Sequence, residues 1–261
     1  MNLLETHAVT KSFGDNIAVN NVDFSVRQGE VLALIGSNGA GKTSLVNLVS
    51  GLLRADSGRI LFDGADVTQQ TSYERIKAGI ARSFQLVNLF DYLSCADNVA
   101  LSIFSRQGKI RRLASLAARD SAVWQEAHEL LQRFGLDRHA SLVAGSISHG
   151  ERKLLDVAVA YALKPKLLLL DEPTSGVSTR EKAPIMDIVS SIVRAGGITV
   201  VIIEHDMDIV FRYSERIVVM HQGTILADGT PDEIRRNDAV TTTLIGTHPT
   251  GEPVYGSAPN A

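Results

Sequence analysis

Gly36-Ser37-Asn38-Gly39-Ala40-Gly41-Lys42-Thr43 lies between an apolar run, residues 31–35, and a helical pattern that begins at Ser44. This order of strand, glycine-rich loop and helix is the context that a phosphate-binding loop requires. Its glycines allow consecutive backbone N–H groups to point inward at the positive end of the following helix, where an anion fits. Lys42 would reach the β- and γ-phosphates of a nucleotide, and the Thr43 hydroxyl would hold Mg²⁺. The stretch therefore predicts binding of a nucleoside triphosphate.

Length and composition limit what else the chain can be. Its 261 residues, 44% of them hydrophobic, are enough to bury the core of one α/β domain. The formal net charge of -3 supplies no basic field, so we expect no nucleic-acid partner. A single cysteine, Cys95, excludes an internal disulfide and suits a reducing compartment. The N-terminus lacks a signal-peptide pattern, and no apolar run approaches the roughly 18 residues that cross a bilayer. We expect a cytoplasmic protein whose role at the membrane is peripheral.

Two segments ahead of the loop, residues 3–13 and 19–26, alternate apolar and polar residues, as half-buried antiparallel strands do. Phe13, at the end of the first, has two interpretations. It packs into the core, which the residues alone favour because aromatic rings are mostly core residues, or it stands at the rim and stacks on a base. After the loop, the pattern predicts a strand over 57–64 and a helix over 72–78.

A strand-like segment, residues 80–85, is followed by helical spacing of apolar residues from about residue 86 to 162. The spacing is clearest in residues 96–104 and 122–134, and it predicts an inserted helical lobe. This lobe carries a basic cluster, which is either a solvated surface or a contact with lipid headgroups or a partner. The cluster consists of Arg106, Lys109, Arg111, Arg112 and Arg119.

Ser148 and Glu151 have the spacing of a capping box, which predicts a helix start and a helix over residues 152–163. The exposed amides of a helix start form an anion site, so the chain carries a second one in addition to the loop at Gly36. The two sites lie on different predicted lobes. They therefore need not face each other within one molecule.

Two later apolar runs end in charged residues. Lys166 opens a strand whose residues 167–170 are all leucine and which is followed by Asp171 and Glu172. Residues 198–203 form another buried strand followed by Glu204-His205-Asp206. Because ligands bind at the carboxyl ends of parallel strands, we expect these groups beside the bound phosphates. Asp171 would help to hold Mg²⁺ through water, and Glu172 would act as a base or position a water molecule.

The remaining segments complete the predicted domain. Residues 178–195 are helical, and Pro184 in their early part requires either a start nearer Ala183 or a bend. Two further strands and a short helix follow, at residues 216–220, 224–227 and 231–236. From about Gly246 the chain is rich in Gly, Pro, Thr and Ser, and we expect residues 246–261 to be disordered.

The order of these motifs, from the loop at Gly36 to His205, resembles that of the ATP-binding subunits of ABC transporters over about residues 3–245. The resemblance implies the P-loop NTPase fold of ABC ATPases. This is an α/β fold with a mixed core sheet, an antiparallel β lobe and an inserted α-helical subdomain, at about residues 87–162 here. It also implies ATP and Mg²⁺ as cofactors.

The resemblance also implies site roles. Phe13 becomes the adenine-stacking ring, and Gln85 the loop glutamine that touches Mg²⁺ and the attacking water and senses the membrane partner. Asp171 matches the metal-binding aspartate, Glu172 the catalytic glutamate and His205 the switch histidine. The nucleotide would be held by Phe13, Gly36, Ser37, Asn38, Gly39, Ala40, Gly41, Lys42, Thr43 and Ser44, and the metal by Thr43, Gln85 and Asp171.

Residues 147–151 stand where the family signature Leu-Ser-Gly-Gly-Gln stands. The in-trans segment is Ser148, His149, Gly150 and Glu151, of which Ser148 and Gly150 would meet the γ-phosphate of ATP held by another copy. Two departures are present: His149 replaces a signature glycine, and residues 175–178, Ser-Gly-Val-Ser, replace the common Ser-Ala-Leu-Asp. The aspartate that crosses the dimer is thus absent, which affects coupling between the two ATP sites more than ATP binding.

These implications lead to a hypothesis: two chains form an antiparallel sandwich, each closing its in-trans segment over ATP on the loop of the other. The second ATPase subunit is the same chain or a sister subunit. The helical lobe would dock on transmembrane permease subunits at the cytoplasmic side of the cell membrane, and a substrate-binding protein would contribute indirectly in an importer.

The Ser-His-Gly signature, residues 204–207 (Glu-His-Asp-Met) and residues 221–223 (His-Gln-Gly) resemble the branched-chain amino-acid and urea import branch. Three alternatives are weaker. An export ATPase of the lipopolysaccharide type is the runner-up, because no ATPase residue contacts the cargo. A soluble ABC ATPase acting on ribosomes usually carries two ATPase units in one chain. A DNA-repair ABC ATPase needs a long coiled-coil insertion and a basic surface.

Overall fold

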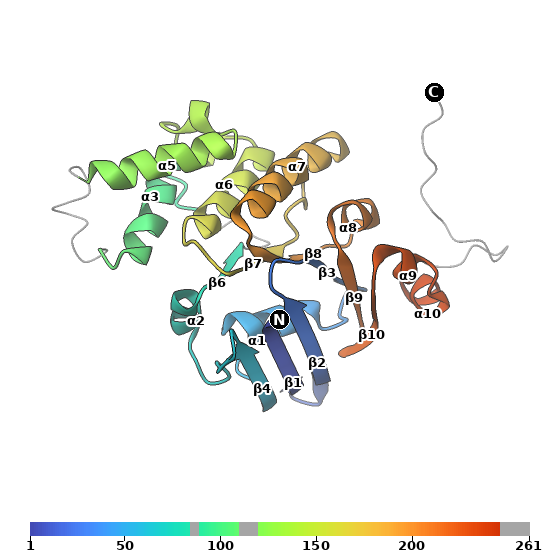
Figure 1. Ribbon diagram of the computed structural model, residues 1–261. Helices are drawn as coiled ribbons and strands as arrows, with labels where there is room; N and C mark the ends of the chain where they lie inside the picture. Colours follow the sequence, from blue (N-terminus) through green and yellow to red (C-terminus); the bar gives the residue numbers. More distant parts are fainter. Residues whose placement is uncertain (84–88, 110–119, 246–261) are drawn as a thin grey trace, which may run out of the picture.

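The structure is a computed structural model, and it describes residues 1–83, 89–109 and 120–245. It contains two sheets and a group of helices. The first sheet lies at the bottom of Figure 1, the second crosses the middle, and helices α3, α5, α6 and α7 lie above the second sheet.

The first sheet has four antiparallel strands in the order β2-β1-β4-β5. They are β1 (Asn2–Phe13), β2 (Asn16–Arg27), β4 (Ser57–Phe62) and β5 (Ala65–Asp66). The predicted strands and their antiparallel pairing are confirmed. Alternate residues such as Leu4, Val22 and Ile60 are buried in a core shared with α1 (Lys42–Ser50), which joins this sheet to the second one.

The second sheet has six strands in the order β10-β9-β3-β8-β7-β6, and all run parallel except β10, which is antiparallel to β9. Its strands are β3 (Val31–Gly36), β6 (Ile80–Ser83), β7 (Leu167–Asp171), β8 (Thr199–Ile203), β9 (Arg216–His221) and β10 (Thr224–Gly229). The predicted mixed core sheet is confirmed. Since β3, β8 and β7 are neighbours, the loops that follow them meet at one edge.

The central strands are buried on both faces, which explains their unbroken apolar sequences. Leu168 and Leu170 of β7 face the core formed with the helices, whereas Leu167 and Leu169 face the core formed with α1 and the first sheet. Burying one such side chain contributes about 1.5–3 kcal/mol. Charged residues at the ends of these strands are therefore held in place by cores on both sides.

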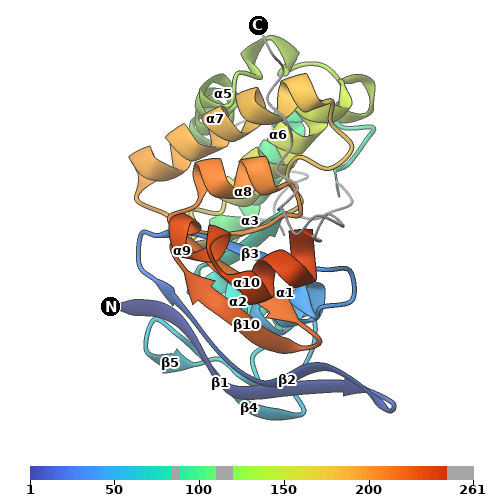
Figure 2. The same cartoon turned by 90° about the vertical axis from the view of Figure 1, so that its right-hand side faces the viewer.

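Helices cover both faces of the second sheet, with α1 on the face toward the first sheet. In addition to α1 they are α2 (Ser72–Ala78), α3 (Cys95–Arg106), α5 (Ser121–Arg133), α6 (His149–Tyr161), α7 (Thr179–Gly196), α8 (Met207–Tyr213), α9 (Pro231–Arg235) and α10 (Asp238–Val240). In both views α5, α6 and α7 lie on the far side of the second sheet from the first (Figures 1 and 2). Among the described residues, no helix has the length and apolar character needed to cross a bilayer.

One predicted helix start is wrong, and one alternative that the sequence left open is decided. Helix α6 begins at His149, not at Arg152, because Ser148 caps it and the helix continues directly from the cap. Helix α7 begins at Thr179, in agreement with the predicted helix over residues 178–195. The alternative start nearer Ala183 is therefore wrong, and Pro184 lies inside the helix. Proline removes one hydrogen bond there, and the buried face of this helix outweighs that loss. That face consists of Ile185, Met186, Val189, Ile192 and Val193.

Some sequence-based expectations fall outside the described residues. These are Gln85, the tail at 246–261 and three members of the basic cluster, Arg111, Arg112 and Arg119. Two members of the cluster are described: Arg106 donates to the Ala162 carbonyl and pairs with Glu126, and Lys109 pairs with Asp120. At these two positions the positive charges are paired within the chain.

Candidate functional site

The loop after β3 has a conformation that requires its glycines. Gly41 has φ +101, a backbone region that side chains other than glycine rarely adopt, and a Cβ there would collide with the Ala18 carbonyl. A Cβ on Gly36 would collide with the Met220 carbonyl in the same way. The loop is therefore packed tightly between β2 and β9, with its backbone available to a ligand.

Helix α1 starts at this loop without a side-chain cap. Its N-cap is Gly41, whereas α2, α3, α6 and α9 each begin with a complete capping box. Lys42 Nζ donates to the carbonyl oxygens of Gly36, at 2.6 Å, and Ser37, at 3.1 Å. The amides and the ammonium group together provide a site for a phosphate chain.

The surroundings of Lys42 have two opposite effects on its pKa. Burial lowers the pKa of Lys42, and the negative charges of Glu172 and Asp171 oppose that decrease. An additional anion such as a phosphate would stabilise the ammonium form further. The loop is thus arranged so that ligand charge offsets the burial of its lysine.

A hollow of about 380 Å³ follows the loop from β1 to the carboxylate after β7. Its lining is Phe13, Asn16, Ala18, Asn38, Gly39, Ala40, Gly41, Lys42, Thr43, Ser44, Glu172 and Ile203. Phe13 lies at the rim and is 50% exposed. The interpretation that Phe13 packs into the core is therefore wrong, because Phe13 ends β1 at the turn into β2 and lines the hollow there.

A second hollow, of about 510 Å³, adjoins the first and shares Asn38 and Glu172 with it. It is lined by Ile35, Gly36, Ser37, Asn38, Glu172, His205, Met207 and Leu244. The two hollows together run from an exposed aromatic ring, past a lysine and a helix start, to a carboxylate and a histidine. Such an arrangement accommodates an elongated anion with a flat group at one end.

Asp171 is buried at the end of β7 and forms an ion pair with Arg82 of β6. Arg82 also donates to Asn47 Oδ1 of α1, at 2.5 Å. The arginine thus connects the metal-binding candidate to the helix that follows the phosphate loop. Sequence reasoning missed Arg82, because nothing in its local pattern indicates which strand lies beside β6.

Glu172 directly follows Asp171 and lines both hollows. It has φ +49, and its backbone N–H donates to the Ile203 carbonyl at 2.9 Å. His205 Nδ1 lies 3.7 Å from Glu172 Oε1. The structure therefore brings together the carboxylate and the imidazole predicted for the site.

Two buried residues hold the backbone around this pair. Glu204 Oε1 accepts hydrogen bonds from the Thr174 hydroxyl, at 2.6 Å, and from its backbone N–H, at 3.1 Å. Lys153 Nζ donates to the Glu172 carbonyl at 3.1 Å. Neither role was predicted from the sequence, since both contacts join segments far apart along the chain.

The segment from Ser148 to Glu151 does not line either hollow. It forms the start of α6, where Ser148 Oγ accepts from the Glu151 N–H and Glu151 Oε2 accepts from the Ser148 N–H. The predicted capping box is confirmed. Within one chain, this second candidate anion site is separate from the first.

Comparison with known proteins identifies the family. The sequence pattern of the family described as "ABC transporter" matches residues 19–175. The chain belongs to the ABC transporter family. It is the ATP-binding cassette of an ABC transporter, an ATPase, and its two sheets and helices form the ABC ATPase fold.

Individual relatives agree with this assignment. The high-affinity branched-chain amino acid transport ATP-binding protein LivG of Salmonella typhimurium is 32% identical over 255 residues, covering 94% of this chain and 98% of LivG. A solved ATP-binding cassette of an ABC transporter in its ADP conformation is 32% identical, with a TM-score of 0.82, covering 94% of this chain and 99% of that one. A bacterial ABC transporter cassette solved as a dimer is 25% identical, with a TM-score of 0.76, covering 87% of this chain and 98% of that one.

The donor set of this ABC ATPase fits Mg²⁺ only together with phosphate oxygens. Thr43 offers an exposed hydroxyl, and Asp171 offers a carboxylate that already pairs with Arg82. No group of three or more His, Cys, Asp or Glu residues in the described ranges could hold a metal ion by itself. Mg²⁺ is commonly bound in this way, by one or two protein groups and the phosphates of its substrate.

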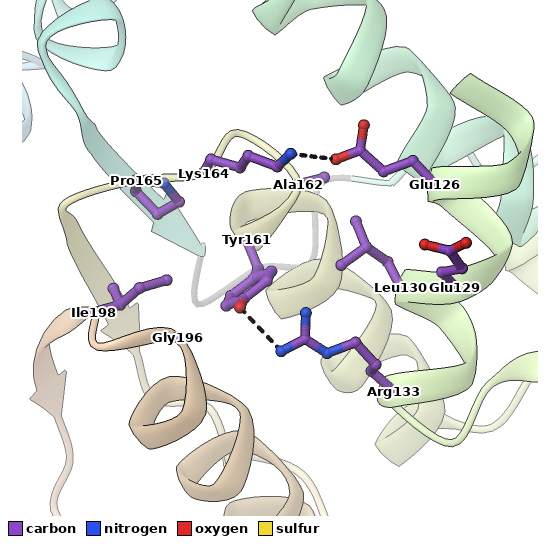
Figure 3. Close-up of a pocket in the computed structure, with 10 residues that line it drawn as sticks. All are labelled: Glu126, Glu129, Leu130, Arg133, Tyr161, Ala162, Lys164, Pro165, Gly196 and Ile198. Atoms are coloured by element: carbon purple, nitrogen blue, oxygen red, sulfur yellow. Dashed lines mark hydrogen bonds and ion pairs between the residues drawn. The ribbon is translucent and has the colours of Figure 1, made fainter. Parts of the chain in front are cut away.

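Another hollow of this ABC ATPase, of about 450 Å³, lies between α5, the end of α6 and the end of α7 (Figure 3). Lys164 pairs with Glu126 at 2.8 Å, and Arg133 donates to the Tyr161 hydroxyl at 3.3 Å. None of the predicted site residues lines it. The two hollows at the phosphate loop are therefore the candidate site.

Proposed function

We propose that this chain hydrolyses ATP to power import of branched-chain amino acids or a related small polar solute. The proposal is supported by the likeness to LivG along nearly the full length of both chains. It is also supported by the Ser148-His149-Gly150 signature and the residues around His205, which resemble the same import branch.

In this proposal Phe13 stacks on adenine at the open rim, and the loop at residues 36–43 and the start of α1 hold the phosphates. Lys42, which contacts loop carbonyls, turns its ammonium group to the β- and γ-phosphates. The observation that supports this arrangement is the continuous lining from Phe13 to His205. Together the two hollows combine an exposed ring, a helix start, a carboxylate and an imidazole.

Glu172 is proposed to position and deprotonate the attacking water, and His205 to order the γ-phosphate. Their separation of 3.7 Å supports a joint role, and the contacts of Lys153 and Glu204 hold the backbone on which both depend. Thr43, Asp171 and Gln85 are proposed to hold Mg²⁺, which would stabilise the charge that develops on the phosphates.

The complete site is proposed to need two chains. Ser148 and Gly150 lie away from the hollows of their own chain. The capping box of α6 engages the N–H groups of Ser148 and Glu151, so the N–H groups of His149 and Gly150 are the ones proposed to meet an anion. An antiparallel pair of chains would place this helix start on the γ-phosphate bound by the other copy. The relative solved as a dimer is consistent with such pairing.

Transmembrane permease subunits are the proposed partners, with the chain at the cytoplasmic side of the membrane and a substrate-binding protein acting indirectly. A largely apolar hollow of about 340 Å³ lies next to β6, the strand that precedes Gln85 in the sequence, and it is the proposed docking site for a permease segment. Leu52 and Ile76 line it and are exposed large apolar side chains. Coverage by a permease segment would remove that apolar surface from water.

The test is uptake of labelled leucine, isoleucine and valine by cells that lack the chain, complemented with the parent or with the Glu172→Gln variant. We expect uptake to be lost, to return with the parent and to remain lost with the variant. Unchanged uptake in the cells that lack the chain would refute the proposed cargo. Normal uptake with the variant would refute the role of Glu172.

A further inference from the structure

The start of α6 touches the loop that follows Glu172 in the same chain. His149 Nε2 lies 3.3 Å from the backbone carbonyl oxygen of Ser175. A carbonyl oxygen only accepts hydrogen bonds, so the contact requires the proton on Nε2. The signature histidine is thus engaged with its own chain.

Gly176 is shaped to receive this ring. Its φ is +73, and a Cβ built on it would lie 2.8 Å from His149 Nε2 and 3.3 Å from Cδ2. Any side chain at position 176 would collide with the imidazole, since carbon atoms pack no closer than about 3.5 Å at their optimum. The ring at 149 and the missing side chain at 176 therefore fit each other.

Lys153, one turn later on the same helix face, holds the same loop. Its buried Nζ donates to the Glu172 carbonyl and to Ser175 Oγ, each at 3.1 Å. Residues four apart on a helix lie one above the other. Helix α6 thus contacts the loop from two successive turns, through His149 and Lys153.

The two departures from the family pattern are therefore in contact. His149 stands where the signature has a glycine, and Gly176 stands where the Ser-Ala-Leu-Asp loop has an alanine. A Cβ at position 176 fits only where the imidazole of residue 149 is absent or displaced. The histidine also adds a hydrogen bond to the Ser175 carbonyl.

We propose that His149 and Gly176 form a matched pair that fixes residues 174–178 against the start of α6. His149 is then a positioning residue, and Ser148 and the loop reach the second chain as one rigid unit. This inference rests on the proposed two-chain site, because only there do both segments meet another copy. The pairing links signature and loop within one chain, whereas the absent aspartate would have crossed the dimer.

The first test is a mutant cycle in the Glu172→Gln chain, which is expected to keep ATP bound. The dissociation constant of the ATP-bound dimer is measured by sedimentation for Gly176→Ala, His149→Gly and the double variant. Because the backbone strain of Ala at φ +73 is the same in both backgrounds, it cancels. We expect Gly176→Ala to raise the dissociation constant by about tenfold more when His149 is present than when it is glycine.

The second test uses the nucleotide-free monomer of the otherwise unaltered chain. The N–H groups of Ser175 and Val177 donate to Glu172 and Thr174 carbonyls, and their hydrogen exchange reports on the loop. We expect His149→Gly to speed exchange there by about tenfold and His149→Gln, which keeps a side-chain donor, to restore part of the protection.

The outcomes separate the two ideas. If the Glu172→Gln chain forms no ATP-bound dimer, the two-chain site is wrong, and hydrogen exchange alone decides whether the pair exists. Equal effects of Gly176→Ala in both backgrounds would overturn the matched pair. Unchanged exchange at Ser175 and Val177 in His149→Gly would overturn it as well.

Discussion

Replacing Arg82 by Met should destabilise the nucleotide-free protein substantially. The Arg82 and Asp171 side chains are only 8% and 4% exposed, so the carboxylate would be left buried without its main partner. Removing one member of a buried ion pair costs about 3–5 kcal/mol. Lys42 and Lys153 also act electrostatically on Asp171, which places the expected loss near the lower end, at about 3 kcal/mol.

Urea unfolding followed by circular dichroism measures this loss. Asn47→Ala is the matched control, because it removes the neutral partner of the same guanidinium group and should cost only about 1 kcal/mol. The double variant with Met at 82 and Asn at 171 leaves no buried charge without a partner. It should therefore recover most of the stability that the Arg82→Met variant loses.

The Arg82→Met chain should also respond more strongly to ligand than the parent does. ATP with Mg²⁺ should stabilise the Arg82→Met chain by more than it stabilises the parent, since a cation near Asp171 replaces the missing charge. If Arg82→Met loses no more stability than Asn47→Ala, or if the double variant is the least stable of the set, the electrostatic account of this pair is refuted.

Three further predictions concern the site. Glu172→Gln should lower ATP turnover by about 10²–10⁴-fold while ATP binding measured by calorimetry is retained, and unchanged turnover would contradict the proposed base. Phe13→Ala should weaken ATP binding by about 1–3 kcal/mol, the size of a base–aromatic stack, whereas Phe13→Tyr should bind as the parent does. Burial opposes ionisation of Asp206, yet the Lys182 ammonium at 2.6 Å and the first amides of α8 hold the pKa of Asp206 below its ordinary value. The stability that Asp206 contributes is thus complete above its unfolded pKa of about 3.9 and is lost as the pH falls through the lower folded pKa. Asp206→Asn should therefore make the loss of stability on acidification less steep, and an equally steep acid unfolding curve would refute this.

Local chemistry explains why much of the site could be predicted. The glycines of residues 36–43 and the capping box at Ser148 are short-range signals, and each determines its own backbone conformation. The apolar strands before Asp171 and His205 predict parallel neighbours, so their charged ends were expected to meet. These features depend on residues close together along the chain.

Other features depend on neighbours that the sequence does not indicate. The partner of Arg82 is 89 positions away, and the order of strands alone brings them together. Residue type alone favoured the core for Phe13, whereas the family resemblance implied a place beside adenine; at the hairpin tip the ring is exposed. The start of α7 depends on a buried face strong enough to tolerate Pro184, which its local pattern underestimates.

The most direct test of the account is complementation between two inactive chains. Lys42→Ala removes the phosphate contact of a chain, and Ser148→Arg blocks the start of α6 that the chain offers to its partner. In an equal mixture half of the dimers are mixed and each has one intact site, so about a quarter of the parent ATPase rate should return. A mixture as inactive as its components, or full activity of Ser148→Arg alone, would contradict the claim that two chains share each ATP.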